Sequence, residues 1–343
     1  MISVLFVVPR FHPNLWFATK ALVESGARVA VWVSDTAPEV EDHSIVAPRV
    51  FADPSDAAGL KAAFAGFAPD LVFLRNTSDL KHAVARAARG TKAQLWSYDQ
   101  HPLDRPRSFW KRLRLRLDGL PARRVTPVPG LTDTPPDPQS RYLPWPVCTG
   151  LPEMPERPDA PVTVLCVGKL AQPRKNQPLV IDALREAGRA GRARLILAGA
   201  TSHTISGADA DHMAVLEAAA REDWCEIHRD VAFRDMPALY ARSHVCILPS
   251  TAEPLGTAPV EAMAWGCVPV ISTSAGSAGY LVDGGDGLLL DLSQPDRIET
   301  ALGALIDDPA LRARLAAGAR ETAGDDLGPK RFLARIRDLL REG

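Results

Sequence analysis

The sequence predicts an α/β protein built from two doubly wound parallel sheets, and three observations support this fold class. Short apolar runs alternate with helical segments along the whole chain, which is typical of parallel sheets with helices on both faces. The length of 343 residues exceeds what one ordinary core needs and suits two domains. A stretch with eleven prolines between Pro127 and Pro161 separates the two series of elements.

The proline-rich stretch discourages regular structure and marks a linker between the domains. We expect an amino-terminal domain over residues 1–150 and a carboxyl-terminal domain over residues 151–327, facing each other across a cleft. The last helix, in residues 328–343, is expected to pack back toward the first domain. Both domains are expected to be Rossmann-like, with ligands bound beyond the carboxyl ends of the strands.

In the first half, continuous apolar runs rich in β-branched residues predict strands that are buried on both faces. They cover residues 2–8, 28–33, 70–74 and 93–97, with one short strand at 140–143. Helices are expected at about 14–24, 55–67 and 80–89. Polar side chains follow three of these strand ends and form candidates for a ligand site: Arg10, His12, Arg75, Asn76, Asp99 and His101. Each of them taken singly is also explained as a solvated loop residue.

Residues 105–118 combine one apolar face with many cations. On a helical wheel the apolar face contains Phe109, Trp110, Leu113, Leu117 and Leu120, while the remaining positions are mostly basic: Arg107, Lys111, Arg112, Arg114 and Arg116. A basic amphipathic helix is typical of contact with an anionic membrane or an acidic acceptor. The alternative is a helix that packs on its own sheet through the apolar stripe.

In the second half, strands are expected at residues 162–167, 193–198, 224–228, 245–248, 268–271 and 288–290. Helices are expected at 177–187, 209–220, 235–242, 295–306, 309–322 and 329–341. Asp235 is expected to cap the third of these helices. Asp209-Ala-Asp211 is the chain's one Asp-x-Asp sequence. Because it stands at a helix start, capping explains it better than metal binding does.

The net charge of -1 gives no general attraction to nucleic acid or to membranes, so any such partner needs a local patch. The five cysteines are scattered without a Cys-x-x-Cys pair, which argues for a reducing compartment and against a zinc site. We see no basic leader and no apolar run long enough to span a bilayer. We therefore expect a soluble cytoplasmic protein, with at most peripheral contact at the inner membrane face.

Two carboxylates lie in the loop and helix between the strands expected at 245–248 and 268–271. Glu253 and Glu261 are eight residues apart, with Gly256 and Thr257 between them. A helix that opens at about Thr257 points free amides at an anion. A loop carboxylate, free amides and a helix carboxylate together suit a ligand with hydroxyls at both ends and phosphate between them, such as a nucleotide-sugar.

Three cations occupy the first strand-to-helix loop of the second domain, where phosphate is commonly bound. They are Lys169, Arg174 and Lys175. A lysine acts there as a mobile point charge on an oxyanion. The alternative is a set of ordinary solvated cations.

These motifs resemble those of the retaining glycosyltransferases of family 4, which have the two-domain GT-B fold. The resemblance is specific over roughly residues 162–292 and weak over the first 150. The family's paired-glutamate motif is similar to Glu253-Pro-Leu-Gly-Thr-Ala-Pro-Val-Glu261 and its sequel Ala262-Met-Ala-Trp-Gly-Cys-Val-Pro-Val270. Its diphosphate loop resembles Gly168-Lys-Leu-Ala-Gln-Pro-Arg-Lys-Asn176.

The resemblance implies roles for matching residues. Glu253 would hold sugar hydroxyls of the donor, and Glu261 would hold the ribose hydroxyls. Lys169 and Lys175 would stabilise charge on the diphosphate. Further donor contacts would come from the amides of Leu255, Gly256 and Thr257 and from the backbone of Val231. In the first domain, His101 is the candidate for contacting the transferred sugar, and the acceptor-side candidates are Arg10, His12, Arg75, Asn76 and Asp99.

The chain also departs from the family pattern. Lys169 replaces a usual arginine, so the charge is kept but bidentate phosphate binding is lost. Arg10-Phe-His-Pro-Asn14 replaces the Gly-Gly loop that commonly follows the first strand, and Gly279 stands where many members carry Glu. The replaced Gly-Gly loop implies an acceptor pocket unlike the well-known ones, whereas Lys169 bears on donor affinity.

We therefore expect a hexosyltransferase-like enzyme that moves a sugar from a UDP- or GDP-sugar to an acceptor hydroxyl, with retention and without a metal or other cofactor. Expected acceptors are glycans, lipid-linked sugars or small molecules in cell-surface glycan, glycolipid or polysaccharide synthesis, with no nucleic-acid partner. One alternative is another GT-B enzyme such as a nucleotide-sugar epimerase, although no clear set of acidic and histidine groups stands in the second-domain loops. The other is a non-catalytic GT-B binding subunit, against which the intact Glu253, Glu261 and Lys175 argue.

Overall fold

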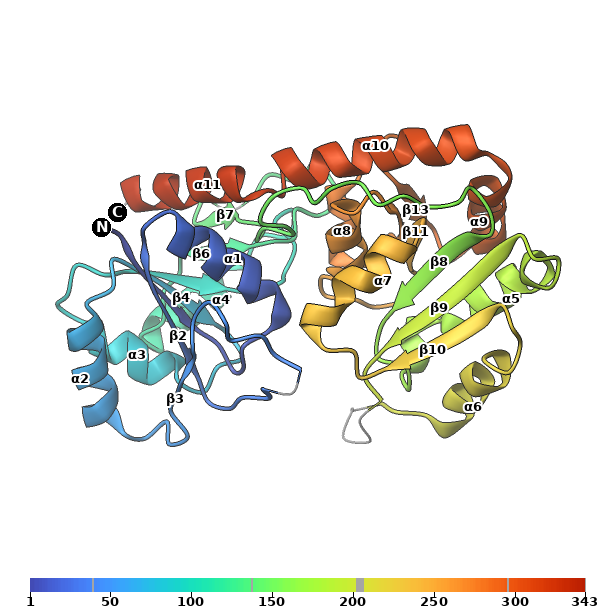
Figure 1. Ribbon diagram of the computed structural model, residues 1–343. Helices are drawn as coiled ribbons and strands as arrows, with labels where there is room; N and C mark the ends of the chain where they lie inside the picture. Colours follow the sequence, from blue (N-terminus) through green and yellow to red (C-terminus); the bar gives the residue numbers. More distant parts are fainter. Residues whose placement is uncertain (39, 137, 202–206, 295, 343) are drawn as a thin grey trace. The chain divides into compact units, whose positions relative to one another are not determined.

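The computed structural model describes residues 1–38, 40–136, 138–201, 207–294 and 296–342. The chain divides into two compact units, one formed by Met1–Thr149 with Leu327–Gly343 and the other by Gly150–Asp326. Figure 1 shows that each unit contains its own sheet with helices beside it. The prediction of two doubly wound parallel sheets is confirmed.

The sheet of the first unit has the strand order β3-β2-β1-β4-β5-β6-β7, and its neighbouring strands are parallel. The strands are β1 (Ser3–Val7), β2 (Arg28–Val33), β3 (Arg49–Val50), β4 (Leu71–Arg75), β5 (Gln94–Tyr98), β6 (Arg124–Thr126) and β7 (Ser140–Tyr142). The helices of this unit are α1 (Pro13–Glu24), α2 (Ala57–Phe67), α3 (Lys81–Ala87), α4 (Phe109–Leu117) and α11 (Pro329–Arg341).

Strand β1 shows why these runs fold as central strands, since each of its residues is buried. Successive side chains point to opposite faces of a sheet. Val4 and Phe6 belong to one hydrophobic cluster, whereas Leu5 and Val7 belong to another. The continuous apolar run therefore fills two cores at once, as expected for a parallel sheet that is covered on both faces.

The last helix, α11, completes the first of these cores. Its residues Phe332, Ile336 and Leu339 are buried in the same cluster as Val4 and Phe6. The side chain of Gln94, at the start of β5, donates a 2.9 Å hydrogen bond to the carbonyl of Leu340. The carboxyl-terminal helix is thus part of the first unit's interior, although it follows the whole second unit in the sequence.

The sheet of the second unit has the order β10-β9-β8-β11-β12-β13, again with parallel neighbours. Its strands are β8 (Val162–Val167), β9 (Ala193–Gly199), β10 (Cys225–Arg229), β11 (Val245–Leu248), β12 (Val268–Ser272) and β13 (Leu288–Leu290). Its helices are α5 (Gln177–Arg189), α6 (Ala210–Ala219), α7 (Met236–Arg242), α8 (Ala258–Met263), α9 (Arg297–Asp307) and α10 (Pro309–Asp325). The five cysteines are free thiols and buried, and Cys166, Cys225, Cys246 and Cys267 pack in the clusters of this unit.

Several local expectations are corrected. Strands β3 and β6 were not predicted, because each is short and contains an arginine. Asp235 does not cap α7 through its side chain, since a 3-10 turn at Phe233–Asp235 leads into the helix instead. Asp209 does cap α6, by accepting a 2.8 Å hydrogen bond from the amide of His212. The start expected at residue 295 for α9 lies outside the described residues, as does the last residue, 343.

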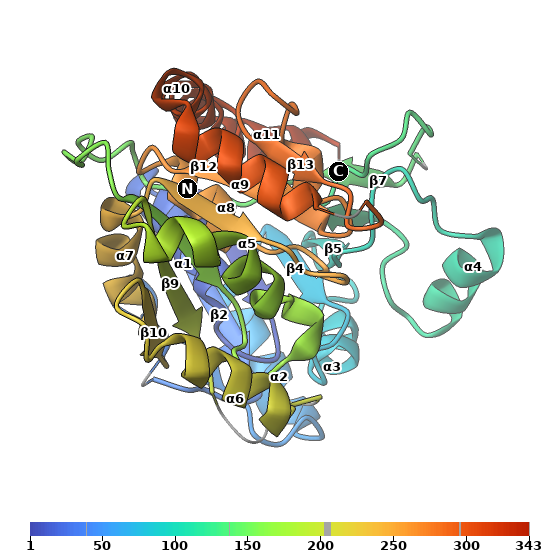
Figure 2. The same cartoon turned by 90° about the vertical axis from the view of Figure 1, so that its right-hand side faces the viewer.

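The basic segment also differs from the expectation. Helix α4 begins only at Phe109, so Arg107 precedes it, and Arg107 is buried rather than solvated. Phe109, Trp110 and Leu117 are 63%, 75% and 79% exposed, so these three residues of the stripe do not pack on the sheet, whereas Leu120 packs against the cluster that contains Leu5 and Val72. Figure 2 shows α4 standing away from strands β4 and β5 of its own unit. Among the described residues, no helix is long and apolar enough to cross a membrane.

Candidate functional site

Each sheet has one point at which the strand order reverses, and this point is where ligands of doubly wound sheets bind. In the first unit it lies between β1 and β4, and in the second unit between β8 and β11. The candidate residues of the second unit stand on the loops that follow these two strands. Lys169 and Lys175 follow β8, and the stretch from Glu253 to Glu261 follows β11.

Glu253 is held in a fixed loop between β11 and α8. Its backbone forms a parallel bridge with Ala275, beyond the end of β12. Its amide donates to the carbonyl of Ser274 at 3.4 Å, and its carbonyl accepts from the amide of Gly276 at 3.0 Å. The neighbouring loop after β12 therefore sets the position of the Glu253 side chain.

The carboxylate of Glu253 contacts two of the three cations in the loop after β8. Lys175 Nζ donates to Oε2 of Glu253, and Arg174 Nη1 lies 3.3 Å from the same oxygen. The side chains of Lys175 and Glu253 are only 9% and 14% exposed. A buried lysine remains charged without a large desolvation cost only when an anion lies beside it. An anionic ligand could therefore contact the ammonium group of Lys175 together with Glu253.

The loops after β8 and β11 are tied together by backbone and amide contacts. The side chain of Asn176 donates a 2.8 Å hydrogen bond to the carbonyl of Pro249. The amide of Thr251 donates to the carbonyl of Arg174 at 3.0 Å. Asn176 itself has a left-handed backbone, with φ of 55°, and ends the 3-10 turn that carries Lys175. These hydrogen bonds keep Lys175 next to Glu253.

The three residues before α8 present unused amides. Within the described part of the chain, the amides of Leu255, Gly256 and Thr257 donate to no protein acceptor. Gly256 has φ of +79°, and a Cβ at this position would lie 2.3 Å from Cδ2 of Leu248. Glycine is therefore required for the loop to turn this tightly. Free backbone amides beside a buried lysine favour an anion of the phosphate type.

Glu261 lies one turn into α8 and is buried. Burial raises the pKa of its carboxyl group, against hydrogen bonds from Thr257 and Tyr240 that lower it. Tyr240 Oη donates to Oε2 of Glu261 at 2.9 Å. Two donors thus orient a carboxylate in the protein interior, which leaves its remaining acceptor positions for ligand hydroxyls.

Lys169 and Val231 are the remaining two candidates for binding the donor. Lys169 is exposed, and its carbonyl accepts from the amide of Gln172 at 3.2 Å. Val231 follows β10 and packs against the cluster that contains Tyr240. The structure gives neither of them a contact with Glu253 or Glu261 among the described residues.

In the first unit, Asp99 is the centre of a network of donors. Its carboxylate accepts from Arg107 at 2.6 Å, from Arg124 at 3.2 Å and from Asn76 Nδ2 at 3.1 Å. The amide of His101 donates to it at 3.2 Å. Asp99 thereby joins Asn76, after β4, to the loop that follows β5. Its acceptor positions are already used by the protein, so Asp99 holds its neighbours in place.

Arg10, Arg75 and the two histidines complete the first-unit candidates. Arg75 lies over the ring of Tyr98 and donates to Gln100 Oε1 at 3.1 Å, and Arg10 pairs with Glu41 at 3.3 Å. Loss of solvent, followed by the charge of Arg75, lowers the pKa of His12. Loss of solvent and then Arg124 lower the pKa of His101. Both residues keep an exposed surface, and both imidazoles are neutral near pH 7.

Three important side chains were missed by sequence reasoning. Tyr240, the partner of Glu261, stands 21 residues before it and belongs to no local motif. The sequence places Arg107 among the basic positions of the amphipathic segment and indicates no role for Arg124, but both donate to Asp99. An arginine inside a β-branched strand such as Arg124-Val-Thr126 was the available signal, because a buried arginine requires an acceptor. Among the described residues, no cluster of His, Cys, Asp and Glu could hold a metal ion.

Comparison with known proteins identifies the family of this site. Residues 152–322 match the family model described as glycosyl transferases group 1. A GDP-mannose-dependent alpha-(1-6)-phosphatidylinositol monomannoside mannosyltransferase from Mycolicibacterium smegmatis is 30% identical over 191 residues, covering 53% of this chain and 48% of that protein. A D-inositol 3-phosphate glycosyltransferase from Xylanimonas cellulosilytica is 34% identical over 122 residues, covering 34% and 29%. The matches thus span half or less of these relatives.

Solved structures share the fold over the whole chain. Anabaena HepE in complex with UDP-glucose superposes with a TM-score of 0.73 at 18% identity, covering 100% of both chains. Sucrose-phosphate synthase from Thermosynechococcus elongatus superposes with a TM-score of 0.69 at 16% identity, covering 100% of this chain and 99% of the other. At such low identity this likeness establishes the GT-B fold alone.

Proposed function

Because this chain belongs to the glycosyl transferases group 1 through its residues 152–322, we propose that it transfers a sugar from a nucleoside diphosphate sugar to an acceptor hydroxyl. The observation that carries the proposal is the grouping around Gly256. Three unused amides lie beside the Lys175–Glu253 pair, and Glu261 is hydrogen-bonded to Thr257 at the end of the same loop. One anion-binding centre flanked by two carboxylates matches a diphosphate flanked by a sugar and a ribose.

In this proposal the amides of Leu255, Gly256 and Thr257 bind the diphosphate. The ammonium group of Lys175 contacts both Glu253 and a phosphate oxygen, and the exposed Lys169 binds the diphosphate from the solvent side. Glu253 then accepts hydrogen bonds from sugar hydroxyls, Glu261 accepts them from the ribose, and the backbone at Val231 contacts the base. The carboxylates select hydroxyl-bearing ligands, whereas the cations and amides select the phosphate.

Catalysis follows from the same groups. The bond between the anomeric carbon and the diphosphate oxygen breaks while the acceptor oxygen bonds to that carbon, and the diphosphate leaves as an anion that takes up the proton of the acceptor hydroxyl. Donors that are already aimed at the diphosphate oxygen stabilise the developing charge without reorganising. Lys169, Lys175 and the amides supply this stabilisation, so the step needs no metal ion. We propose that the anomeric configuration is retained and that His101 contacts the transferred sugar.

The names of the relatives support a proposal for the classes of donor and acceptor. One relative is named for GDP-mannose and a phosphatidylinositol mannoside, others for D-inositol 3-phosphate, and HepE was solved with UDP-glucose. We propose a UDP- or GDP-sugar donor and a lipid-linked or small polar acceptor in glycolipid or cell-surface glycan synthesis. The acceptor contacts come from Arg10, His12, Arg75 and Asn76, which Asp99 holds in place. The segment 105–117 brings the enzyme to an anionic membrane at its cytoplasmic face.

A panel of UDP-, GDP- and ADP-sugars tested by thermal shift examines this function. A donor that binds the folded state raises the melting temperature, and the rise grows with the ratio of donor concentration to its dissociation constant. We expect one class of donor to do so, and Glu261→Ala to reduce the rise at equal donor concentration. Lys61→Met, an exposed position on α2, is the control and should keep it. If no donor shifts the wild-type protein, the proposed function is wrong.

A further inference from the structure

Helix α4 exposes an apolar surface that no described residue of its own unit covers. Phe109, Trp110 and Leu117 are more than half exposed, and none of the residues of the helix is buried. Side chains of this kind at a helix surface cost free energy in water unless a partner covers them. The helix is nevertheless well defined at its start, where Ser108 Oγ accepts a hydrogen bond from the amide of Lys111.

The charges around this surface indicate an anionic partner. Apart from the buried Arg107, the segment 105–118 carries five cations, Arg105, Lys111, Arg112, Arg114 and Arg116, and one carboxylate, Asp118. Only Arg114 approaches that carboxylate, at 3.8 Å. The chain as a whole has a net charge of -1, so the excess of cations in this segment is not a property of the whole chain. An apolar stripe beside unpaired cations is complementary to a bilayer that contains anionic lipids.

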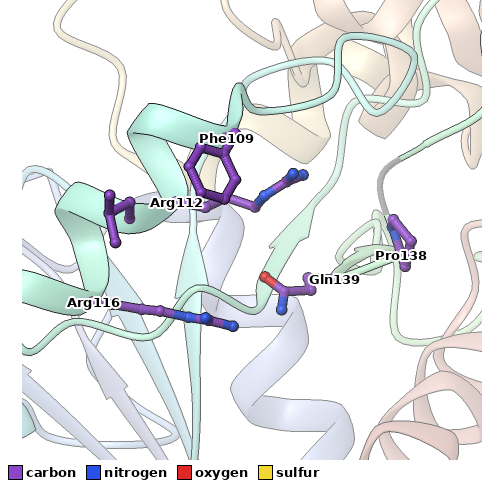
Figure 3. A pocket seen from close by; sticks show the side chains of 6 residues that line it. Phe109, Arg112, Arg116, Pro138 and Gln139 are labelled. Atoms are coloured by element: carbon purple, nitrogen blue, oxygen red, sulfur yellow. The ribbon is translucent and has the colours of Figure 1, made fainter.

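Two of these cations border a hollow of about 370 Å³. It is lined by Phe109, Arg112, Leu113, Arg116, Pro138 and Gln139. In Figure 3, Arg112 and Arg116 extend from α4 toward Gln139 on the facing segment. Among the described residues, the side chain of Arg116 has no ion pair or hydrogen bond, and the side chain of Arg112 donates only to the carbonyl of Arg107 at 3.2 Å.

We propose that this hollow binds the phosphate of an anionic glycerophospholipid while the neighbouring aromatic side chains enter the lipid. Arg112 and Arg116 are four residues apart and thus adjacent on the helix surface. Arginine matches a phosphate with two parallel hydrogen bonds. Phe109 and Leu113 form the apolar wall against which the glycerol and first methylenes lie. The inference deepens the membrane contact of the proposed function and rests on it, but it does not depend on which donor is used.

Binding to phosphatidylcholine vesicles with and without phosphatidylglycerol tests the site. The variant Arg112→Ala/Arg116→Ala removes the two cations of the hollow, and Lys111→Ala/Arg114→Ala removes two cations of the same helix outside it. Loss of two charges near an anionic surface lowers partitioning roughly thirty-fold. We expect this loss for the control pair and about a further ten-fold for the hollow pair, because its charge-assisted hydrogen bonds are lost as well. Equal losses in the two variants would overturn the headgroup site.

Three further readouts keep the result unambiguous. Arg116→Ala alone removes no hydrogen bond or ion pair between described residues, and it should weaken vesicle binding more than Arg114→Ala does, whatever the double variants do to folding. The shift in tryptophan fluorescence on anionic vesicles should vanish in Trp110→Phe, and a shift that persists contradicts insertion of α4.

Glycerol 3-phosphate should compete poorly with the vesicles. If this soluble phosphate bound as well as the lipid does, the hollow would not be a site for a lipid headgroup. Thermal shifts caused by donors in the absence of vesicles test the donor site of the second unit, whereas vesicle binding tests α4 in the first unit. Failure of the proposed function can therefore be distinguished from failure of the lipid site.

Discussion

The hydroxyl of Tyr240 donates a 2.9 Å hydrogen bond to Oε2 of Glu261 inside the second unit. Both residues are buried. Glu261 also interacts with the side chain of Thr257, which precedes α8. The carboxylate proposed to bind the ribose is therefore oriented by two side chains from different segments before any ligand arrives. Such preorientation lowers the entropic cost of binding.

Removal of the Tyr240 hydroxyl tests this orientation. Tyr240→Phe keeps the ring in the core but deprives Glu261 of a donor. We expect donor affinity to fall about ten-fold and stability to fall by about 1–3 kcal/mol, the usual cost of leaving a buried polar group unpaired. Calorimetric titration and urea unfolding measure the two effects. Tyr142→Phe, in the first unit, is the matched control, and donor affinity that is unchanged in Tyr240→Phe contradicts the positioning role.

The raised pKa of Glu261 predicts a pH dependence of stability. The unfolded carboxyl ionises near 4.5, while burial raises the pKa of the folded one above this value. Between these two pKa values the folded state binds the proton more tightly, so stability falls as pH rises. We expect the unfolding free energy of the wild type, relative to Glu261→Gln, to decrease as pH increases from 4.5 through the folded pKa. A difference that grows with pH is the opposite result and excludes this cause.

Gly256 is predicted to be required for the shape of the donor loop. In Gly256→Ala the new Cβ would meet Leu248 at 2.3 Å and Cγ of Glu253 at 2.9 Å. The positive φ alone costs about 1–2 kcal/mol, and relief of the contacts displaces Glu253. Gly191→Ala provides the control, because Gly191 has φ of +71° with nothing within 4 Å. Both variants should lose stability, but only Gly256→Ala should also lose donor binding in the thermal-shift panel.

The network around Asp99 is predicted to stabilise the first unit. Arg124 is fully buried and also donates to Ser140 Oγ at 2.6 Å and to the carbonyl of His101 at 2.9 Å. Arg124→Met leaves these acceptors unpaired, and breaking one side of a buried ion pair costs about 3–5 kcal/mol. Urea unfolding measures this loss. Arg341→Met removes the exposed pair with Asp338 on α11 and should change stability little; similar losses in both variants contradict the role of the network.

The elements that the sequence predicted well are those whose local pattern determines their environment. Strands β8, β11 and β13 have the predicted bounds, because each is a short apolar run that ends at a loop. Strand β3 consists of two exposed residues and forms only through pairing with β2. Strand β6 begins at Arg124, whose burial depends on acceptors far along the chain. Such partners leave no periodic signal in the sequence.

In the candidate site, too, contacts between residues far apart in the sequence could not be predicted. The spacing of Glu253 and Glu261 predicted a loop carboxylate and a helix carboxylate, and the structure has both on either side of Thr257. The contact between Lys175 and Glu253 joins residues 78 positions apart, and only the order of the parallel strands brings their loops together. Tyr240 could not be predicted at all, since a buried tyrosine in a short helix is ordinary core.

Calorimetric titration of a nucleoside diphosphate sugar into the wild type and Lys175→Met tests the proposed site most directly. Lys175 is the buried cation next to the unused amides, and Lys61→Met provides an exposed control of the same chemistry. The proposed site predicts micromolar to millimolar binding by the wild type, unchanged binding by Lys61→Met and a loss of at least about ten-fold in Lys175→Met, since a charge-assisted contact to phosphate disappears. Equal affinity of Lys175→Met and the wild type would contradict it.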